Sequence, residues 1–355
     1  MKELISHIRH LFANFQISKF SNYLIYSLLI FGLSSCFKEK LLKPPTNDNA
    51  GQSNLITMRG PNYDDQFFYS LATNTIVSSN SRFIYDLMFD CNPATFHIWL
   101  NSAKFSCVAD VGTSVPFGQV TLQDTVGYNF NYERGAYSTD SSAFGEWRDS
   151  ASVANNSNNP NSKGHVYIIN LGVDTLGNPF GYIKMMVVSF SDGGYNIVYS
   201  DMANLNNVVM SVPKDPTRNY RYLSVATNQL LPIEPDARTW DLCFTHYTYV
   251  FYIPYLLPYE VTGVLTNPSR VQAYLYTDTF MNFDSVKISN FNPGLLQTQR
   301  DVIGYDWKRY TGTYTVNSQY TYFISASNNV YYKLHFVGYY LNGVEGYISL
   351  QYVQL

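Results

Sequence analysis

The residues that most often carry enzyme chemistry are few in this chain and lie far apart. Its 355 residues include six histidines and four cysteines, without a Gly-rich phosphate loop or a GxSxG motif. No Cys-x-x-Cys pair or cysteine–histidine spacing typical of zinc is present. Four histidines stand isolated in the sequence: His97, His165, His246 and His335. The pattern favours a protein that is not an enzyme and has no metal site.

Two carboxylates recur at the same place in a repeated motif. Tyr85-Asp86-Leu87-Met88-Phe89 returns as Trp240-Asp241-Leu242-Cys243-Phe244. A glycosidase-type acid pair would need a second carboxylate in a convincing setting, and the sequence provides none. Because Asp86 and Asp241 recur together, we expect a shared structural role, in which each caps a turn or accepts a hydrogen bond from neighbouring backbone.

The repeated motif belongs to a duplication of the whole chain. Ala72-Thr73-Asn74 recurs as Ala226-Thr227-Asn228, and Val166-Tyr167-Ile168-Ile169 resembles Thr321-Tyr322-Phe323-Ile324. Glu146-Trp147-Arg148 likewise resembles Asp306-Trp307-Lys308. The matching segments lie about 155 residues apart. Solenoid repeats are only about 20–50 residues long, so a repeat of this length indicates two copies of one domain. We predict domains over 54–204 and 205–355.

Composition indicates that both domains are β structures. Aromatic residues make up 17% of the chain, with 32 Tyr and 23 Phe, whereas charged residues make up 14%. Such residues suit pleated, half-buried surfaces and leave few helix formers for exposed helix faces. Alternation predicts strands at 83–90, 166–170, 240–253 and 331–338, the last placing His335 toward solvent. The expected fold is all-β, with two tandem, mostly antiparallel domains and little helix. The net charge of −3 argues against nucleic-acid binding.

The N-terminus has the pattern of a lipoprotein signal peptide. A mildly basic start precedes the apolar run Leu24–Leu33, which is shorter than the roughly 20 residues that span a bilayer. Leu33-Ser34-Ser35-Cys36 then resembles a bacterial lipobox. We predict a signal peptide over 1–35, lipidation of Cys36 and a flexible tether over 36–53. No Asp follows Cys36, which favours the outer membrane and the cell surface, with attachment by lipid alone.

Three further cysteines lie within the predicted domains. Cys91 and Cys107 could pair in an oxidising compartment, or each could be a small buried side chain. Cys243 has no evident partner and is expected in the core.

The second half resembles a known family. Trp240-Asp241-Leu242-Cys243-Phe244 with Tyr247, Val302-Ile303-Gly304-Tyr305-Asp306-Trp307-Lys308 and the C-terminal strands are similar to segments of the HmuY-like haem-binding lipoproteins of the Bacteroidetes. The likeness covers about residues 213–355 and, through the repeat, more weakly 59–200. It implies an all-β fold and haem held by two axial ligands, His or Met, on long loops.

The implied ligand set is incomplete in this chain. No His lies between His246 and His335, and the only Met there is Met281, next to Phe280 and near Phe283. Met281 is therefore the candidate axial ligand, with core packing as the alternative. The resemblance implies capture of haem or a related tetrapyrrole for nutrient acquisition, with transfer to an outer-membrane transporter. The alternative is a glycan- or host-protein-binding module on the same scaffold, without haem.

Overall fold

The computed structural model describes residues 56–57, 64–135, 142–252, 255–278 and 281–355. The predicted signal peptide, Cys36 and the whole predicted tether, 36–53, therefore lie outside the described residues. The described chain is all-β and mostly antiparallel, as predicted. Its one α-helix is α3 (Ser150–Ala154), and six 3-10 turns are η1 (Ser102–Lys104), η2 (Phe117–Gln119), η3 (Leu122–Val126), η4 (Ile288–Asn290), η5 (Pro293–Leu295) and η6 (Ser327–Asn329).

Two sheets enclose the first core. One has the strand order β11-β10-β9-β8-β6-β7 and the other β13-β12-β4-β5. Leu87, Ile98 and Leu223 of the smaller sheet pack against Ile169 and Met185 of the larger one. The strands are β4 (Leu87–Asp90), β5 (Ile98–Leu100), β6 (Cys107–Gly112), β7 (Asn131–Tyr132), β8 (Val166–Asn170), β9 (Tyr182–Ser191), β10 (Gly194–Asp201), β11 (Val208–Pro213), β12 (Tyr220–Ser224) and β13 (Gln229–Leu231).

Two further sheets enclose the second core. Their orders are β1-β21-β20-β19-β16 and β15-β14-β2-β3, and Phe67, Leu242 and Val264 of the latter pack against Ile324 and Leu334 of the former. The strands are β1 (Ile56–Thr57), β2 (Asp65–Ser70), β3 (Thr75–Ser81), β14 (Leu242–Phe251), β15 (Leu257–Thr266), β16 (Gln272–Thr277), β19 (Tyr320–Ala326), β20 (Val330–Leu341) and β21 (Val344–Gln354). A separate two-stranded sheet joins β17 (Lys308–Tyr310) and β18 (Tyr314–Val316).

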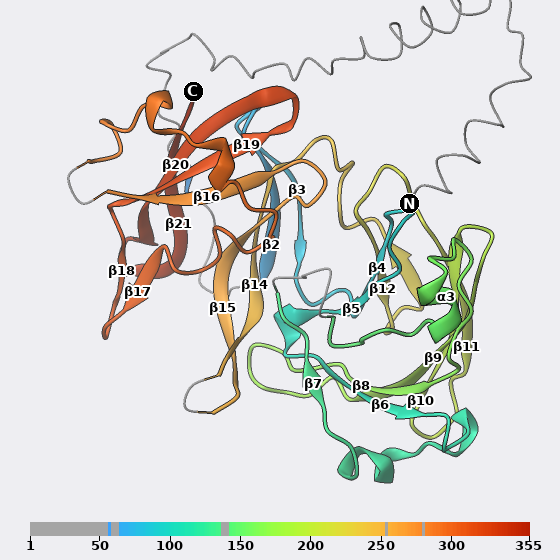
Figure 1. Cartoon of the computed structure of the whole chain (residues 1–355). Helices are drawn as coiled ribbons and strands as arrows, with labels where there is room; N and C mark the ends of the chain where they lie inside the picture. The colour runs from blue at the N-terminus through green and yellow to red at the C-terminus, as the bar shows by residue number, and fades with distance from the viewer. Residues whose placement is uncertain (1–55, 58–63, 136–141, 253–254, 279–280) are drawn as a thin grey trace, which may run out of the picture. The chain divides into compact units, whose positions relative to one another are not determined.

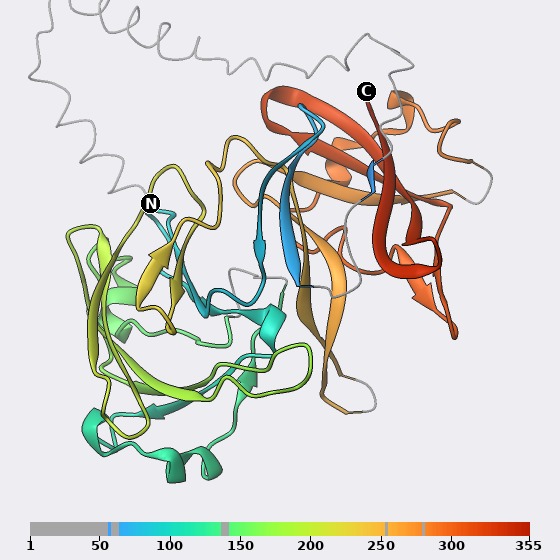
Figure 2. The same ribbon diagram turned by 180° about the vertical axis from the view of Figure 1, so that it is seen from behind.

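The two copies exchange their first hairpins. Strand β2 pairs with β14, so that Phe68 lies opposite Cys243, while β12 pairs with β4, with Tyr222 opposite Met88. The blue β2 lies beside the gold β14 in both views (Figure 1, Figure 2). Strand pairing therefore crosses residues 204 and 205, and the division into domains at that point stays a prediction.

The repeated aspartates hold these exchanged strands, as the sequence suggested. Asp86 Oδ2 accepts a hydrogen bond from the backbone N–H of Val225 at 2.7 Å, and Asp241 Oδ2 accepts one from Leu71 at 2.8 Å. Each carboxylate also has a cation: Lys104 Nζ lies 2.5 Å from Asp86 Oδ1, and Arg270 Nε lies 3.1 Å from Asp241 Oδ1. Both aspartates are buried. Each binds the loop that follows the first strand of the other copy.

The three cysteines of the described residues are buried free thiols. Cys91 and Cys107 are thus not paired, and Cys243 packs with Phe68 and Trp240 between the two smaller sheets. No helix in the described ranges is long and apolar enough to cross a membrane.

We predict that the buried aspartates are required for stability. Asp86→Ala leaves the buried Lys104 ammonium without its counter-ion and should cost about 3–5 kcal/mol of unfolding free energy. Asp241→Ala leaves the buried Leu71 N–H without its acceptor and the half-buried Arg270 without its counter-ion, and should cost about 2–4 kcal/mol. Urea unfolding of each variant measures the loss. Asp65→Ala, at an exposed position of β2, is the control. A loss below about 1 kcal/mol for Asp86→Ala or Asp241→Ala would contradict the anchoring role.

Candidate ligand-binding cleft

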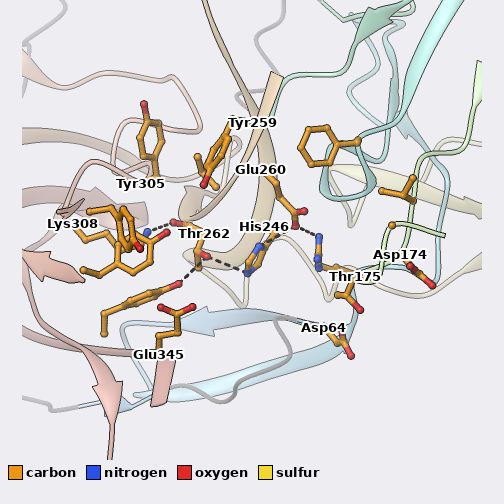
Figure 3. A pocket seen from close by; sticks show the side chains of 18 of the residues that line it. Asp64, Asp174, Thr175, His246, Tyr259, Glu260, Thr262, Tyr305, Lys308 and Glu345 are labelled. Carbon is orange, nitrogen blue, oxygen red and sulfur yellow. Dashed lines mark hydrogen bonds and ion pairs between the residues drawn. The ribbon is translucent and has the colours of Figure 1, made fainter. Parts of the chain in front are cut away.

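A cleft of about 1010 Å³ opens beside the β14–β15 hairpin (Figure 3). Its walls come from this hairpin, from the segment around β17 and β18, and from the loop Val173–Gly177 between β8 and β9. Seven aromatic residues line it: Phe105, Phe251, Tyr259, Tyr305, Tyr310, Tyr314 and Tyr339. Pockets for small molecules usually measure about 300–1,000 Å³, so this cleft suits a large ligand.

Close backbone contact places the segment before β17 against β15. Val264 and Gly304 exchange two backbone hydrogen bonds, of 2.9 and 3.1 Å. Gly304 has a φ of +59°, and a Cβ on Gly263 would lie 2.7 Å from the Gly304 carbonyl oxygen. Larger residues would therefore push the two segments apart. The two glycines thus allow Tyr305 and Lys308 to reach the cleft.

The aromatic side chains form two groups on the cleft wall. Tyr249 packs edge-on against Tyr305 and Phe251, each with ring centroids 4.9 Å apart. Tyr314 makes equally close contacts with Tyr310 and Tyr339, also at 4.9 Å. Tyr259 and Tyr310 remain 52% and 62% exposed, so their rings are available to a ligand.

A chain of hydrogen bonds crosses the floor of the cleft. The Tyr339 hydroxyl donates to Thr262 Oγ1 at 3.0 Å, and Thr262 Oγ1 lies 3.2 Å from His246 Nε2. His246 Nδ1 lies 3.1 Å from Glu260 Oε1, which also pairs with Arg82 (Figure 3). A carboxylate can only accept, so we infer that Nδ1 of His246 carries the proton and that Nε2 accepts from Thr262.

Burial and neighbouring charges set the protonation states of His246 and Glu260 in this series of hydrogen bonds. Burial lowers the pKa of His246 to about 4, assisted by the positive charge of Arg82, which together outweigh the hydrogen bond to Glu260. For Glu260, burial alone would raise the pKa, but the hydrogen bond from His246 and the charge of Arg82 bring it below its ordinary value. At neutral pH the floor therefore contains a neutral imidazole and an ion pair.

Lys308 stands at the other end of the floor. Its Nζ donates to the Thr262 carbonyl oxygen at 2.5 Å and lies 4.4 Å from the centre of the Trp307 ring. Burial lowers the pKa of Lys308 to about 7, although the charge of Asp306 opposes the shift. Burial of the positive charge on Lys308 is therefore unfavourable in free energy. An anion bound beside it would offset part of that penalty.

The arrangement is suited to binding. Burial raises the pKa of Tyr305, and raises that of Tyr314 to about 12, so both phenols stay protonated. Both ring nitrogens of His246 already have partners in the protein. Within the described residues, no three His, Cys, Asp or Glu side chains lie close enough together to hold a metal ion.

Met281 does not line this cleft. It packs with Tyr276, Val286 and Phe291, and its sulfur lies 3.5 Å from the Tyr276 hydroxyl and 3.8 Å from Asn290 Nδ2. Its assignment as an axial haem ligand stays a prediction. The sequence reasoning did not identify Arg82, Glu260 or Lys308; only Lys308 carried a signal, because it belongs to the repeated Asp306-Trp307-Lys308 motif.

Comparison with protein families and with curated proteins finds no match. Among solved structures, apo PinO of Porphyromonas gingivitis has 9% identity and a TM-score of 0.28, over 86% of this chain and 98% of that one. A Bacteroides vulgatus protein described as HmuY-like and haem-binding has 16% identity and a TM-score of 0.21, covering 39% of this chain and 80% of its own. A Bacteroides fragilis protein described as a lipoprotein has 14% identity and a TM-score of 0.24, with coverages of 47% and 92%. These likenesses are distant, and what the cleft can bind rests on its own residues.

We predict that His246 makes the protein less stable in mild acid. Its folded-state pKa lies below the ordinary value of 6.5, so between about pH 6.5 and 4 the unfolded chain binds a proton that the folded chain does not. Stability should therefore fall as the pH drops, by up to about 1.4 kcal/mol per pH unit from this residue.

Urea unfolding between pH 7 and 4.5 should show a smaller decline for His246→Gln than for the unmodified protein. The buried acids Glu133 and Glu234 are present in both chains, so their titration cancels in the comparison. His165→Gln, outside the cleft, serves as the control. Equal slopes for the unmodified chain and His246→Gln would refute the assignment.

Proposed function

We propose that this protein is a non-catalytic, lipid-anchored protein of the outer membrane that captures haem or a related tetrapyrrole for nutrient acquisition. The observation that carries the proposal is the size and lining of the cleft, which combines about 1010 Å³ with seven aromatic residues. Flat aromatic ligands gain from stacked and edge-on ring contacts as well as from buried area. The anchor at Cys36 would keep such a receptor at the membrane, where an outer-membrane transporter could accept the ligand.

Haem in this cleft would be held chiefly by ring contacts. His246 is committed to Thr262 and Glu260, and Met281 lies elsewhere. The exposed phenols of Tyr259 and Tyr310 are the available oxygen donors, and tyrosine is a known axial ligand of haem iron. A ligand bound mainly through its ring would also be bound without iron, as the free porphyrin.

A glycan is the second candidate, supported by the same floor. The Lys308 ammonium faces the cleft and donates one hydrogen bond to the Thr262 carbonyl oxygen. A sugar hydroxyl can accept a hydrogen bond from this ammonium, and the exposed rings of Tyr259 and Tyr310 can contact the apolar face of a sugar. Binding of oligosaccharides on a glycan array, without a porphyrin signal, would favour this alternative.

We predict saturable binding of haemin to the chain from Leu42 onward, with a shift of the Soret band. Tyr259→Ala and Tyr310→Ala should each weaken binding by about 2- to 10-fold, because each removes an exposed ring that contacts the ligand. Tyr255→Ala, which removes a 78% exposed ring outside the cleft, is the matched control.

Met281→Ala separates the two possible haem positions. Loss of binding in this variant, with Tyr259→Ala and Tyr310→Ala unaffected, would place the ligand at Met281 and refute the cleft. Absence of any saturable shift in the unmodified chain would refute haem binding.

A further inference from the structure

Lys308 is a buried cation without a carboxylate partner. It is 9% exposed, and no ion pair to it occurs among the described residues. The acid nearest in sequence, Asp306, is exposed and forms no ion pair with it. Buried charges are ordinarily paired because transfer of an ion from water costs several kcal/mol. The ammonium of Lys308 is therefore buried without a counter-ion among the described residues.

The other buried lysines differ from Lys308 chiefly in where they lie, since among the described residues only Lys104 has a carboxylate partner and the rest, like Lys308, donate to backbone carbonyls. Lys104 pairs with Asp86, Lys184 Nζ donates to the Val120 carbonyl at 2.6 Å, and Lys333 Nζ donates to two carbonyls of the loop before η4, at 2.7 and 2.8 Å. None of these three lines the cleft, whereas Lys308 does. Its Nζ donates one of its three N–H groups to the Thr262 carbonyl oxygen, and the other two can donate to a ligand.

The equivalent residue of the first copy is satisfied internally. Arg148 occupies the place of Lys308 in the repeated motif and forms a double hydrogen bond with Glu146, of 2.8 and 2.5 Å. Lys308 does not use Asp306 in this way but turns toward Thr262 and the cleft. The second copy thus lacks this internal ion pair and has a lysine that faces the cleft.

Aromatic rings surround the ammonium. Nζ lies 4.4 Å from the ring centre of Trp307, 5.0 Å from that of Tyr339 and 5.6 Å from that of Tyr314. These rings favour a cation and exclude water, so an anion that reaches Lys308 meets a poorly screened charge.

We propose that Lys308 is an anion subsite and binds a carboxylate of the cleft ligand. The inference rests on the proposed function, and it assigns the acidic side chain of a tetrapyrrole to this end of the cleft. Arg82 is already paired with Glu260, and Asp64 and Asp174, on that side of the cleft, would repel a second anion, while Glu345 is the acid of the lining on the Lys308 side (Figure 3). One carboxylate is therefore fixed, and the ligand enters in one orientation.

The test compares protoporphyrin IX with its dimethyl ester, which has the same ring without the negative charges. Fluorescence titration should show that the unmodified protein binds the acid about 10- to 100-fold more tightly, the range expected for a hydrogen bond to a charged group. Lys308→Met should abolish that preference by weakening only the acid. Arg309→Met removes the same charge from the next, exposed residue and should change neither.

Equal affinity for acid and ester, with no effect of Lys308→Met, would overturn the subsite and leave porphyrin binding intact. Failure of both porphyrins to bind would refute the proposed function, and the subsite would then be decided with acetate and inorganic phosphate. Either anion should raise the thermal unfolding midpoint of the unmodified protein and of Arg309→Met above that of Lys308→Met. A response to phosphate alone would identify a phosphorylated ligand and overturn the carboxylate; no difference among the three chains would overturn the subsite.

Discussion

The pairing of each copy's first hairpin with the other copy is the constraint on which the structure depends. Strand β2 pairs with β14 and β12 pairs with β4, so each hairpin is completed into a sheet by two strands from the other half of the chain. Asp86 and Asp241 each bind a backbone N–H just beyond the exchanged strand, from inside the protein. Because a buried carboxylate is costly without partners, this contact fixes the register of the exchanged strand as well as holding it. Neither half has a complete pair of sheets without the other.

The geometry of the cleft depends on this pairing of hairpins between the two halves. Arg82 follows directly after β3, in the hairpin that the first copy contributes, while its partner Glu260 lies on β15 of the second. Asn101 holds the same turn, since its Nδ2 donates to the carbonyls of Arg82 and Tyr85 at 2.7 and 2.9 Å. The pairing of the hairpins thus brings in the Arg82 charge, which adds to burial in lowering the pKa of His246 and to the His246 hydrogen bond in lowering that of Glu260. A binding site in one half depends on residues from both.

The sequence predicted the local structure well and the long-range structure poorly. Alternation identified the strand around 240–253, observed as β14, and the repeated motif led correctly to a backbone-binding role for Asp86 and Asp241. Alternation also placed His335 on a face away from the core, but Phe283 stacks on that imidazole at 3.8 Å, so it does not simply face solvent. Periodicity describes a strand and contains no information on which loop covers its outer face. For the same reason, periodicity could not predict the ion pair between Arg82 and Glu260, because that contact depends on which hairpins pair with each other.

The duplication also explains why one cleft, not two, is expected. Strands β4 and β14 are equivalent, but β4 ends at Asp90 after four residues whereas β14 continues to Phe251. The shared portion of β14 ends at Thr245, and the cleft residues of the hairpin, from His246 through Phe251 to Thr262, lie in the extension or opposite it. The first copy has no such extension, and its Arg148 is occupied by Glu146. The hairpin wall of the cleft therefore belongs to the extension found in the second copy, while Arg82, Phe105 and the loop Val173–Gly177 of the first copy complete the lining. Because this extension occurs once, the proposed function implies one ligand per chain.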